Sequence, residues 1–178
     1  MKNKFIFSII IFVFSLNVKS QNNAFKINPV SFFYKGFEIS YERKSQEKSS
    51  VELLISHLKT RQKNLEGDLI MNAFELRYKF LLSEKTESIE GWYIAPTGSL
   101  SRGKVKFDLQ NKNPNDIVVN SIGAIGGYQF IFENKKSNGF LVDLYFGALN
   151  NFAKSQNLDI SDIKGIKLRF GISIGYGF

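Results

Sequence analysis

Hydrophobic and polar side chains alternate with a period of two along most of this chain. The segment over residues 165–178 (GIKLRFGISIGYGF) shows the alternation most clearly. One face of this segment is apolar or aromatic at every position, and the opposite face carries only lysine, arginine, serine and glycine. Because successive side chains of a β-strand point to opposite faces of a sheet, this period predicts a strand with two different faces.

Six further segments show the same alternation and are also predicted to be strands. They lie at residues 37–42, 51–58, 70–82, 92–101, 118–132 and 139–148. Strands of soluble sandwiches usually contain about five or six residues, and several of these segments are longer. Their lengths fit the roughly 9 to 11 residues that a tilted strand needs to cross a bilayer.

The connections between these segments alternate in length. Residues 45–49, 83–89 and 133–138 are short, whereas residues 60–68, 105–116 and 149–162 are longer. Bacterial outer-membrane barrels have short periplasmic turns, longer external loops and an even number of strands. An eighth strand is expected at residues 25–33, with a tight turn at residues 34–36, although Pro29 is unfavourable inside a strand. The predicted fold is all-β, an eight-stranded antiparallel up-and-down transmembrane β-barrel.

Alternation alone does not say which face points inward, because a soluble barrel buries its apolar face and a membrane barrel its polar face. Glycine is frequent on the polar face, where a narrow interior leaves little room. Tyr41, Trp92 and Tyr176 lie near strand ends, as in an interfacial girdle. Phe178 ends the apolar face of the last strand and resembles the signal read by the outer-membrane assembly machinery, which is a predicted partner.

The first twenty residues have the layout of a secretory signal peptide. Lys2 and Lys4 precede an apolar run over residues 5–18, and Ser20 offers a small residue before a cleavage site. The run is shorter than the roughly 20 residues that a spanning helix needs. We expect cleavage near Ser20 and a barrel domain over residues 21–178, located in the outer membrane of a Gram-negative bacterium.

Five stretches also carry a resemblance to a known family. They are residues 27–29 (INP), 37–43 (FEISYER), 91–96 (GWYIAP), 125–130 (IGGYQF) and 170–178 (FGISIGYGF). These stretches resemble small outer-membrane β-barrel proteins of unknown function from Gram-negative bacteria, and the resemblance covers most of the mature chain. It implies a signal peptide and a membrane barrel, and it supplies no catalytic residues.

Composition narrows the chemistry further. The 178 residues contain no cysteine and one histidine, which excludes disulfides, iron–sulfur clusters, thiolate zinc sites and multi-histidine metal sites. We therefore predict no catalytic residues, no metal site and no cofactor. Loss of Lys2, Lys4 and Lys19 with the signal peptide lowers the formal net charge from +8 to +5, an ordinary basicity that does not indicate a nucleic-acid partner.

The predicted interior contains acidic and basic residues in nearly equal number. They are Glu38, Glu42, Glu52, Glu75, Asp143, Arg77, Lys79, Lys167 and Arg169. Eight strands enclose an interior just wide enough for side chains to fill. A closed network of paired charges is the favoured interpretation, and a narrow or gated polar pore is the alternative.

Two basic clusters follow predicted strands at the ends that would face outward from the cell. They are Lys59, Arg61 and Lys63, and Arg102, Lys104 and Lys106. Near the outer-leaflet headgroups, these side chains are predicted to pair with lipopolysaccharide phosphates and other outer-membrane lipids. Solvated loop residues without a ligand are the alternative.

The predicted role is therefore structural or surface-interacting rather than catalytic. One alternative is a secreted or periplasmic lipocalin-like barrel that binds a hydrophobic ligand. Another is an outer-membrane lipid hydrolase using Ser56 and His57, with Glu52 and Glu66 nearby in sequence. Adjacent residues of a strand point to opposite faces, which argues against a contact between Ser56 and His57. The sequence predicts no particular external protein partner.

Overall fold

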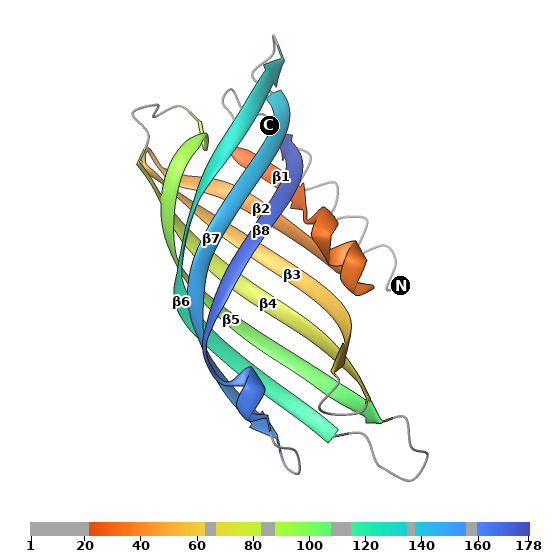
Figure 1. The fold of residues 1–178 in the computed structure, drawn as a ribbon. Helices are drawn as coiled ribbons and strands as arrows, with labels where there is room; N and C mark the ends of the chain where they lie inside the picture. The colour runs from red at the N-terminus through yellow and green to blue at the C-terminus, as the bar shows by residue number, and fades with distance from the viewer. Residues whose placement is uncertain (1–21, 63–66, 83–87, 108–114, 135–137, 156–159) are drawn as a thin grey trace, which may run out of the picture.

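The computed structural model describes residues 22–62, 67–82, 88–107, 115–134, 138–155 and 160–178. Eight antiparallel strands form one sheet that closes on itself, because β1 pairs with both β2 and β8 (Figure 1). They are β1 (Asn23–Ile27), β2 (Phe37–Gln46), β3 (Ser49–Gln62), β4 (Gly67–Leu81), β5 (Gly91–Phe107), β6 (Asn115–Asn134), β7 (Asn138–Ser155) and β8 (Gly165–Gly177). The predicted all-β, eight-stranded, up-and-down barrel is confirmed.

Two short 3-10 helices, η1 (Pro29–Tyr34) and η3 (Ser161–Ile163), accompany the strands. Among the described residues, no helix has the length and apolar character needed to cross a membrane. The expected signal peptide, residues 1–20, lies outside the described residues.

The first strand is shorter than predicted. It ends at Ile27, and residues 29–34, which we expected to continue it, form η1. Pro29 has no N–H to donate to a sheet partner but suits the first turn of a helix. The side chain of Asn28 accepts a hydrogen bond from the backbone N–H of Val30 (3.0 Å) and caps this turn. Lys35 then adopts the left-handed conformation (φ 49°), which turns the chain into β2.

We call the barrel end with Asn23 and Phe178 the proximal rim, and the opposite end the distal rim. The connections β2–β3, β4–β5 and β6–β7 lie at the proximal rim, and β3–β4, β5–β6 and β7–β8 lie at the distal rim. The β1–β2 connection, which contains η1, lies short of the distal rim. The strands extend further than predicted, so residues 82–90 and residues 156–164 form connections of equal length. The predicted strict alternation of short and longer connections is therefore wrong.

The inner and outer faces of the barrel wall differ strongly in polarity. Most large apolar side chains on the strands are exposed on the outer face, with Phe170 81% and Leu168 73% exposed on β8. The charged side chains of Lys26, Glu42, Glu52, Arg77, Lys79 and Asp143 are buried on the inner face. The alternation in the sequence therefore corresponds to an apolar outside and a charged inside.

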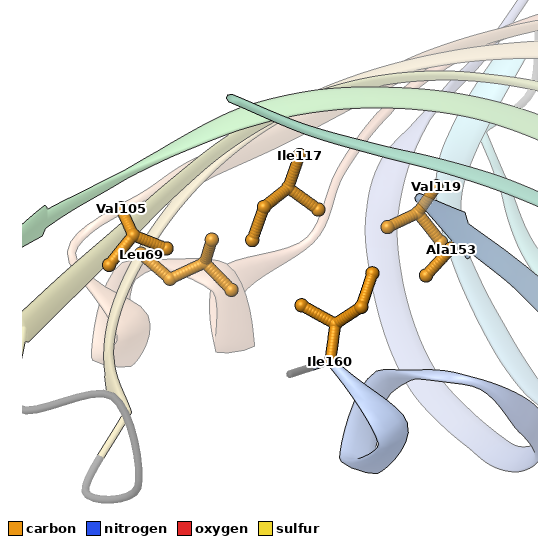
Figure 2. Close-up of a cluster of buried hydrophobic side chains, with 6 residues drawn as sticks. All are labelled: Leu69, Val105, Ile117, Val119, Ala153 and Ile160. Carbon is orange, nitrogen blue, oxygen red and sulfur yellow. The ribbon is translucent and has the colours of Figure 1, made fainter. Parts of the chain in front are cut away.

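The interior is nevertheless not polar at every level. A buried apolar cluster lies near the proximal rim and consists of Ala24, Ile89, Ile131 and Leu141. A second cluster lies near the distal rim and consists of Leu69, Val105, Ile117, Val119, Ala153 and Ile160. Figure 2 shows Ile160, which precedes η3, directed toward the side chains from the strands. The charged interior is thus bounded by apolar packing on both sides.

The barrel wall is incomplete toward the distal rim. β1 pairs with β8 only between Ala24–Gly177 and Ile27–Ile174, so residues 165–173 of β8 have β7 as their only strand partner within the described chain. Residues 58–62 of β3 likewise pair only with β4 in that part of the chain. η1 contacts β2, β3 and β8 and lies beside these two unpaired edges (Figure 1).

Candidate functional site

The sheet register brings the two predicted basic clusters together. β4 lies between β3 and β5, and Ile70 on β4 is opposite both Lys59 and Lys104. Asn72 on the same strand is opposite Arg102. Lys59, Arg61, Arg102 and Lys104 therefore form one basic patch on the outside of the distal rim. The two clusters are far apart in the sequence, so their proximity could not be predicted from it.

The other two predicted basic residues are placed less fully. Lys63 lies outside the described residues, and the backbone of Lys106 pairs with Asp68. Lys35, which follows η1, is an additional cation close enough to act electrostatically on Asp68. Lys35 was not among the predicted basic residues, because residues 34–36 were expected to form only a turn.

Acidic side chains partly neutralise the basic patch. Lys59 Nζ lies 2.7 Å from an Asp68 carboxylate oxygen, and Lys104 Nζ lies 3.8 Å from one of Asp116. The hydrogen bond from Lys59, helped by the charges of Arg61 and Lys35, lowers the pKa of Asp68, which lies at the distal rim. A bound phosphate would therefore have to compete with carboxylates already present.

A second group of charged residues fills the proximal half of the barrel. Lys26 Nζ lies 2.5, 3.2 and 2.8 Å from carboxylate oxygens of Glu42, Glu52 and Asp143. Lys79 Nζ lies 3.0 Å from an oxygen of each of the same three carboxylates. We call these five residues the charge cluster. Since burial of an unpaired charge is costly, each ammonium group stabilises the carboxylates around it.

A layer of paired charges adjoins the charge cluster on its distal side. Arg77 Nε donates to Glu75 (2.6 Å), and the guanidinium of Arg169 donates to Glu75 and lies 3.5 Å from Glu38. Arg77 Nη2 has no hydrogen-bond partner among the described residues, but its guanidinium carbon lies 4.5 Å from the ring centre of Tyr145. This position allows a cation–π interaction.

Glycines on the inner face make room for two buried tyrosines. A Cβ atom at Gly127 would lie 2.5 Å from Tyr93 Oη, and one at Gly171 would lie 2.3 Å from Tyr145 Oη. Tyr93 uses this space to donate a hydrogen bond to Asp143 (2.8 Å). The predicted frequency of glycine on the polar face thus has a specific steric cause.

The charge cluster also contains a carboxylate triad. Oxygens of Glu42, Glu52 and Asp143 lie within 4.8 Å of one another, a spacing that could hold a cation. The ammonium groups of Lys26 and Lys79 already lie among these oxygens, and Gln129 accepts hydrogen bonds from both lysines (2.7 and 2.5 Å). The arrangement therefore provides its own counter-ions and fills the interior at this level.

Two predictions about the interior need correction. Lys26 was not among the predicted interior charges, because no inner or outer face was assigned to residues 25–33. Lys167 was expected among the paired interior charges, but it is exposed and has no acidic partner in the described part of the chain. The alternating pattern predicted the face of each residue but not its partner.

The suggested hydrolase pair is not brought together. Ser56 is buried on the inner face, whereas His57 is on the outer face and its Nδ1 lies 2.7 Å from Asn72 Oδ1. Their opposite directions agree with the expectation for neighbouring strand residues.

Comparisons with protein-family models, curated proteins and solved structures find no significant match to this chain.

Proposed function

We propose that this chain is an integral outer-membrane β-barrel of a Gram-negative bacterium, with a structural or surface-interaction role rather than a catalytic one. The single observation that carries the proposal is the polarity of the wall, which has buried ion pairs inside and exposed aromatic and aliphatic residues outside. Monomeric soluble proteins rarely expose large contiguous apolar surfaces. A lipid environment removes the free-energy cost of exposing these apolar side chains to water.

The dimensions of the strands support the same proposal. All strands except β1 contain 10 or more residues, enough to cross the hydrocarbon region at a tilt of about 45°. Aromatic pairs lie on the outer face near the proximal rim, with ring centres of Trp92 and Tyr128, and of Phe25 and Tyr41, 5.0 Å apart. Such a belt is typical of a membrane–water interface.

The closing strand supports a proposed interaction with the outer-membrane assembly machinery. Phe178 exchanges backbone hydrogen bonds with Asn23 (2.8 and 3.0 Å), and its ring stacks on Phe25 at 5.8 Å. The last strand and its final aromatic residue therefore take part directly in ring closure. A signal in this strand would be accessible to the machinery only before the barrel closes.

The basic patch suggests a role at the cell surface. With the proximal rim in the periplasm, the patch lies outside the cell beyond the apolar side chains of β3 and β4. Lysine and arginine form strong charge-assisted hydrogen bonds with phosphates. We infer that the patch contacts lipopolysaccharide phosphates when these displace Asp68 and Asp116.

Membrane fractionation tests the proposal. A tagged full-length protein is expressed in a Gram-negative host, and carbonate-washed outer membranes are run on a gel with and without boiling. Sedimentation with the outer membrane and a heat-dependent shift in mobility are expected for a folded membrane barrel. Recovery of folded protein in the soluble periplasm or the medium would overturn the proposal and favour the lipocalin-like alternative.

A further inference from the structure

A cavity of about 520 Å³ lies inside the distal half of the barrel. Its volume is in the range of roughly 300 to 1,000 Å³ that is common for small-molecule sites. The cavity lies between the paired charges around Arg169 and the apolar cluster drawn in Figure 2. Neither the charge cluster nor the basic patch extends into it.

One wall of the cavity consists of serine hydroxyls. Ser56 on β3 and Ser101 on β5 are both opposite Ala73 on β4, and Ser99 on β5 is opposite Ser121 on β6. None of these four serines has a side-chain hydrogen-bond partner within the described residues, although Ser56, Ser99 and Ser101 are buried. Buried hydroxyls normally have partners, so this wall can donate hydrogen bonds to a bound molecule.

The two ends of the cavity differ in polarity. Glu75, Tyr145 and Arg169 line the end that adjoins the paired charges, whereas Leu69 and Val119 line the distal end. A ligand that fills the cavity must therefore contact polar groups along part of its length and apolar groups along the rest. This requirement describes an amphiphile better than a sugar or a hydrocarbon.

The cavity extends to the outer face past the unpaired edge of β8. Lys167 and Arg169 point inward from β8, whereas Leu168 and Phe170 point outward, yet all four line the same cavity. Residues of both faces of β8 therefore border the cavity, which reaches the edge of this strand. Within the described chain that edge has no strand partner, because β1 ends at Ile27.

The charge at this opening indicates the sign of the ligand. Arg169 already pairs with Glu38 and Glu75. Lys167 and Asp162 also line the cavity, and no ion pair joins Lys167 to Asp162 or to another carboxylate of the described residues. An available ammonium group beside unpartnered hydroxyls favours an anionic head group.

We propose that this cavity binds a single-chain anionic amphiphile, with its carboxylate or phosphate at Lys167 and the serine wall and its acyl chain against Leu69 and Val119. The ligand enters sideways past Leu168 and Phe170. Only this route of entry rests on the proposed membrane location. The chemistry of the cavity does not depend on it.

Photo-crosslinking tests the site directly. Full-length folded protein in phosphatidylcholine vesicles is irradiated with palmitic acid that carries a diazirine near its chain end, and the labelled residues are mapped by mass spectrometry. We expect labels on the inward positions Leu69 and Val119. A lysophosphatidic acid probe with the same chain distinguishes a phosphate from a carboxylate head, and the uncharged methyl ester should label the interior weakly.

Two variants and a control separate the cavity from the surrounding lipid. Lys167→Gln should reduce interior labelling about tenfold at limiting probe, since the charge-assisted bond is lost. Ser101→Phe should abolish it by filling the cavity. Lys154→Gln removes an exposed lysine on β7 and should leave labelling unchanged. Because Lys167 is exposed, its variant is expected to fold even if Ser101→Phe does not.

The outcomes separate this inference from the proposed function. Labels confined to outer residues such as Phe25 and Phe74, or interior labelling that Lys167→Gln does not change, would overturn the cavity proposal. A protein that passes the fractionation test but shows no interior label retains its proposed location. If the protein is soluble and is labelled inside, the cavity proposal stands and the proposed membrane location is wrong.

Discussion

The proximal and distal halves of the barrel interior are built from the same alternating pattern but differ in how their polar groups are used. In the proximal half, Lys26 and Lys79 each contact three carboxylates. In the distal half, the hydroxyls of Ser56 and Ser101 face a cavity and have no hydrogen-bond partner in the part of the chain that the structure describes. The first half is a packed polar core, and the second has room for another molecule.

The difference has its origin in the short first strand. β1 contributes Lys26 to the charge cluster and closes the wall against β8. After Ile27 the chain turns into η1, because Pro29 does not continue the strand. Among the described residues, the distal half therefore lacks one strand of wall and one row of inward side chains. A local break in the sequence thus leads to both the cavity and its side opening.

The largest expected effect is the removal of a buried cation from the proximal half. Lys79→Met leaves the carboxylates of Glu42, Glu52 and Asp143 with one lysine, and we expect a loss of about 3–5 kcal/mol in the free energy of unfolding. Denaturant unfolding in vesicles, followed by fluorescence of Trp92, the single tryptophan, measures this loss. Lys104→Met is the control and should change stability by less than about 1 kcal/mol because Lys104 is exposed. Equal losses of stability for Lys79→Met and Lys104→Met would contradict the view that the proximal half is a packed polar core.

A matched pair of serine variants compares the two halves directly. Ser50 donates a hydrogen bond to Glu42 in the charge cluster, whereas Ser101 has no side-chain hydrogen-bond partner among the described residues. We expect Ser50→Ala to lower the free energy of unfolding by about 1.5–3 kcal/mol and Ser101→Ala by less than about 0.5 kcal/mol. The same unfolding assay applies to both. A larger loss for Ser101→Ala would show that its hydroxyl is already engaged.

A glycine variant tests how tightly the boundary between the halves is packed. The Cβ of Gly171→Ala would collide with the ring of Tyr145, and we expect a loss of about 1–3 kcal/mol in the free energy of unfolding. In the Tyr145→Leu background the added loss should largely disappear, which a double-mutant cycle measures. Gly98→Ala is the control, because its nearest heavy atom would lie 3.8 Å away.

The smallest effect per residue is expected on the outside of the distal rim. Replacing Lys59, Arg61, Lys63, Arg102, Lys104 and Lys106 by Gln should weaken lipopolysaccharide binding by the detergent-folded protein, with about 0.2–1 kcal/mol lost per exposed contact. Titration at low and high salt should show that the affinity of the wild-type protein depends more strongly on salt than the affinity of the sixfold variant does. Lys154→Gln combined with Lys164→Gln serves as a control on the same rim. Unchanged binding by the sixfold variant would remove the proposed lipopolysaccharide contact.

Much of the fold could be predicted because each strand carries its own signal. The alternation over residues 165–178 identified β8 to within a residue, and the polar positions of β4 correctly gave Glu75, Arg77 and Lys79 as neighbours on one face. The end of β1 was harder to predict, because residues 25–33 are apolar enough for a strand and only Pro29 argued against one. Lys26 was missed for the same reason.

The candidate sites depend on the pairing register between strands, which cannot be read from the sequence of a single segment. The basic residues of β3 and β5 meet only because β4 aligns them. The four serines come from three strands, β3, β5 and β6, and form one wall only because the register places them at neighbouring levels. In the sequence these serines are ordinary polar positions of alternating strands. Their lack of partners becomes visible only when the opposite wall is in place.

The sequence by itself determined the period of each strand, the two faces of the wall and the antiparallel order, since these follow from local steric preferences and neighbouring connections. Only the tertiary structure decided which charges pair, where the wall stays open and where a cavity remains. Those properties depend on side chains from strands distant in the chain, whose distances are set by closure of the barrel and the register between strands.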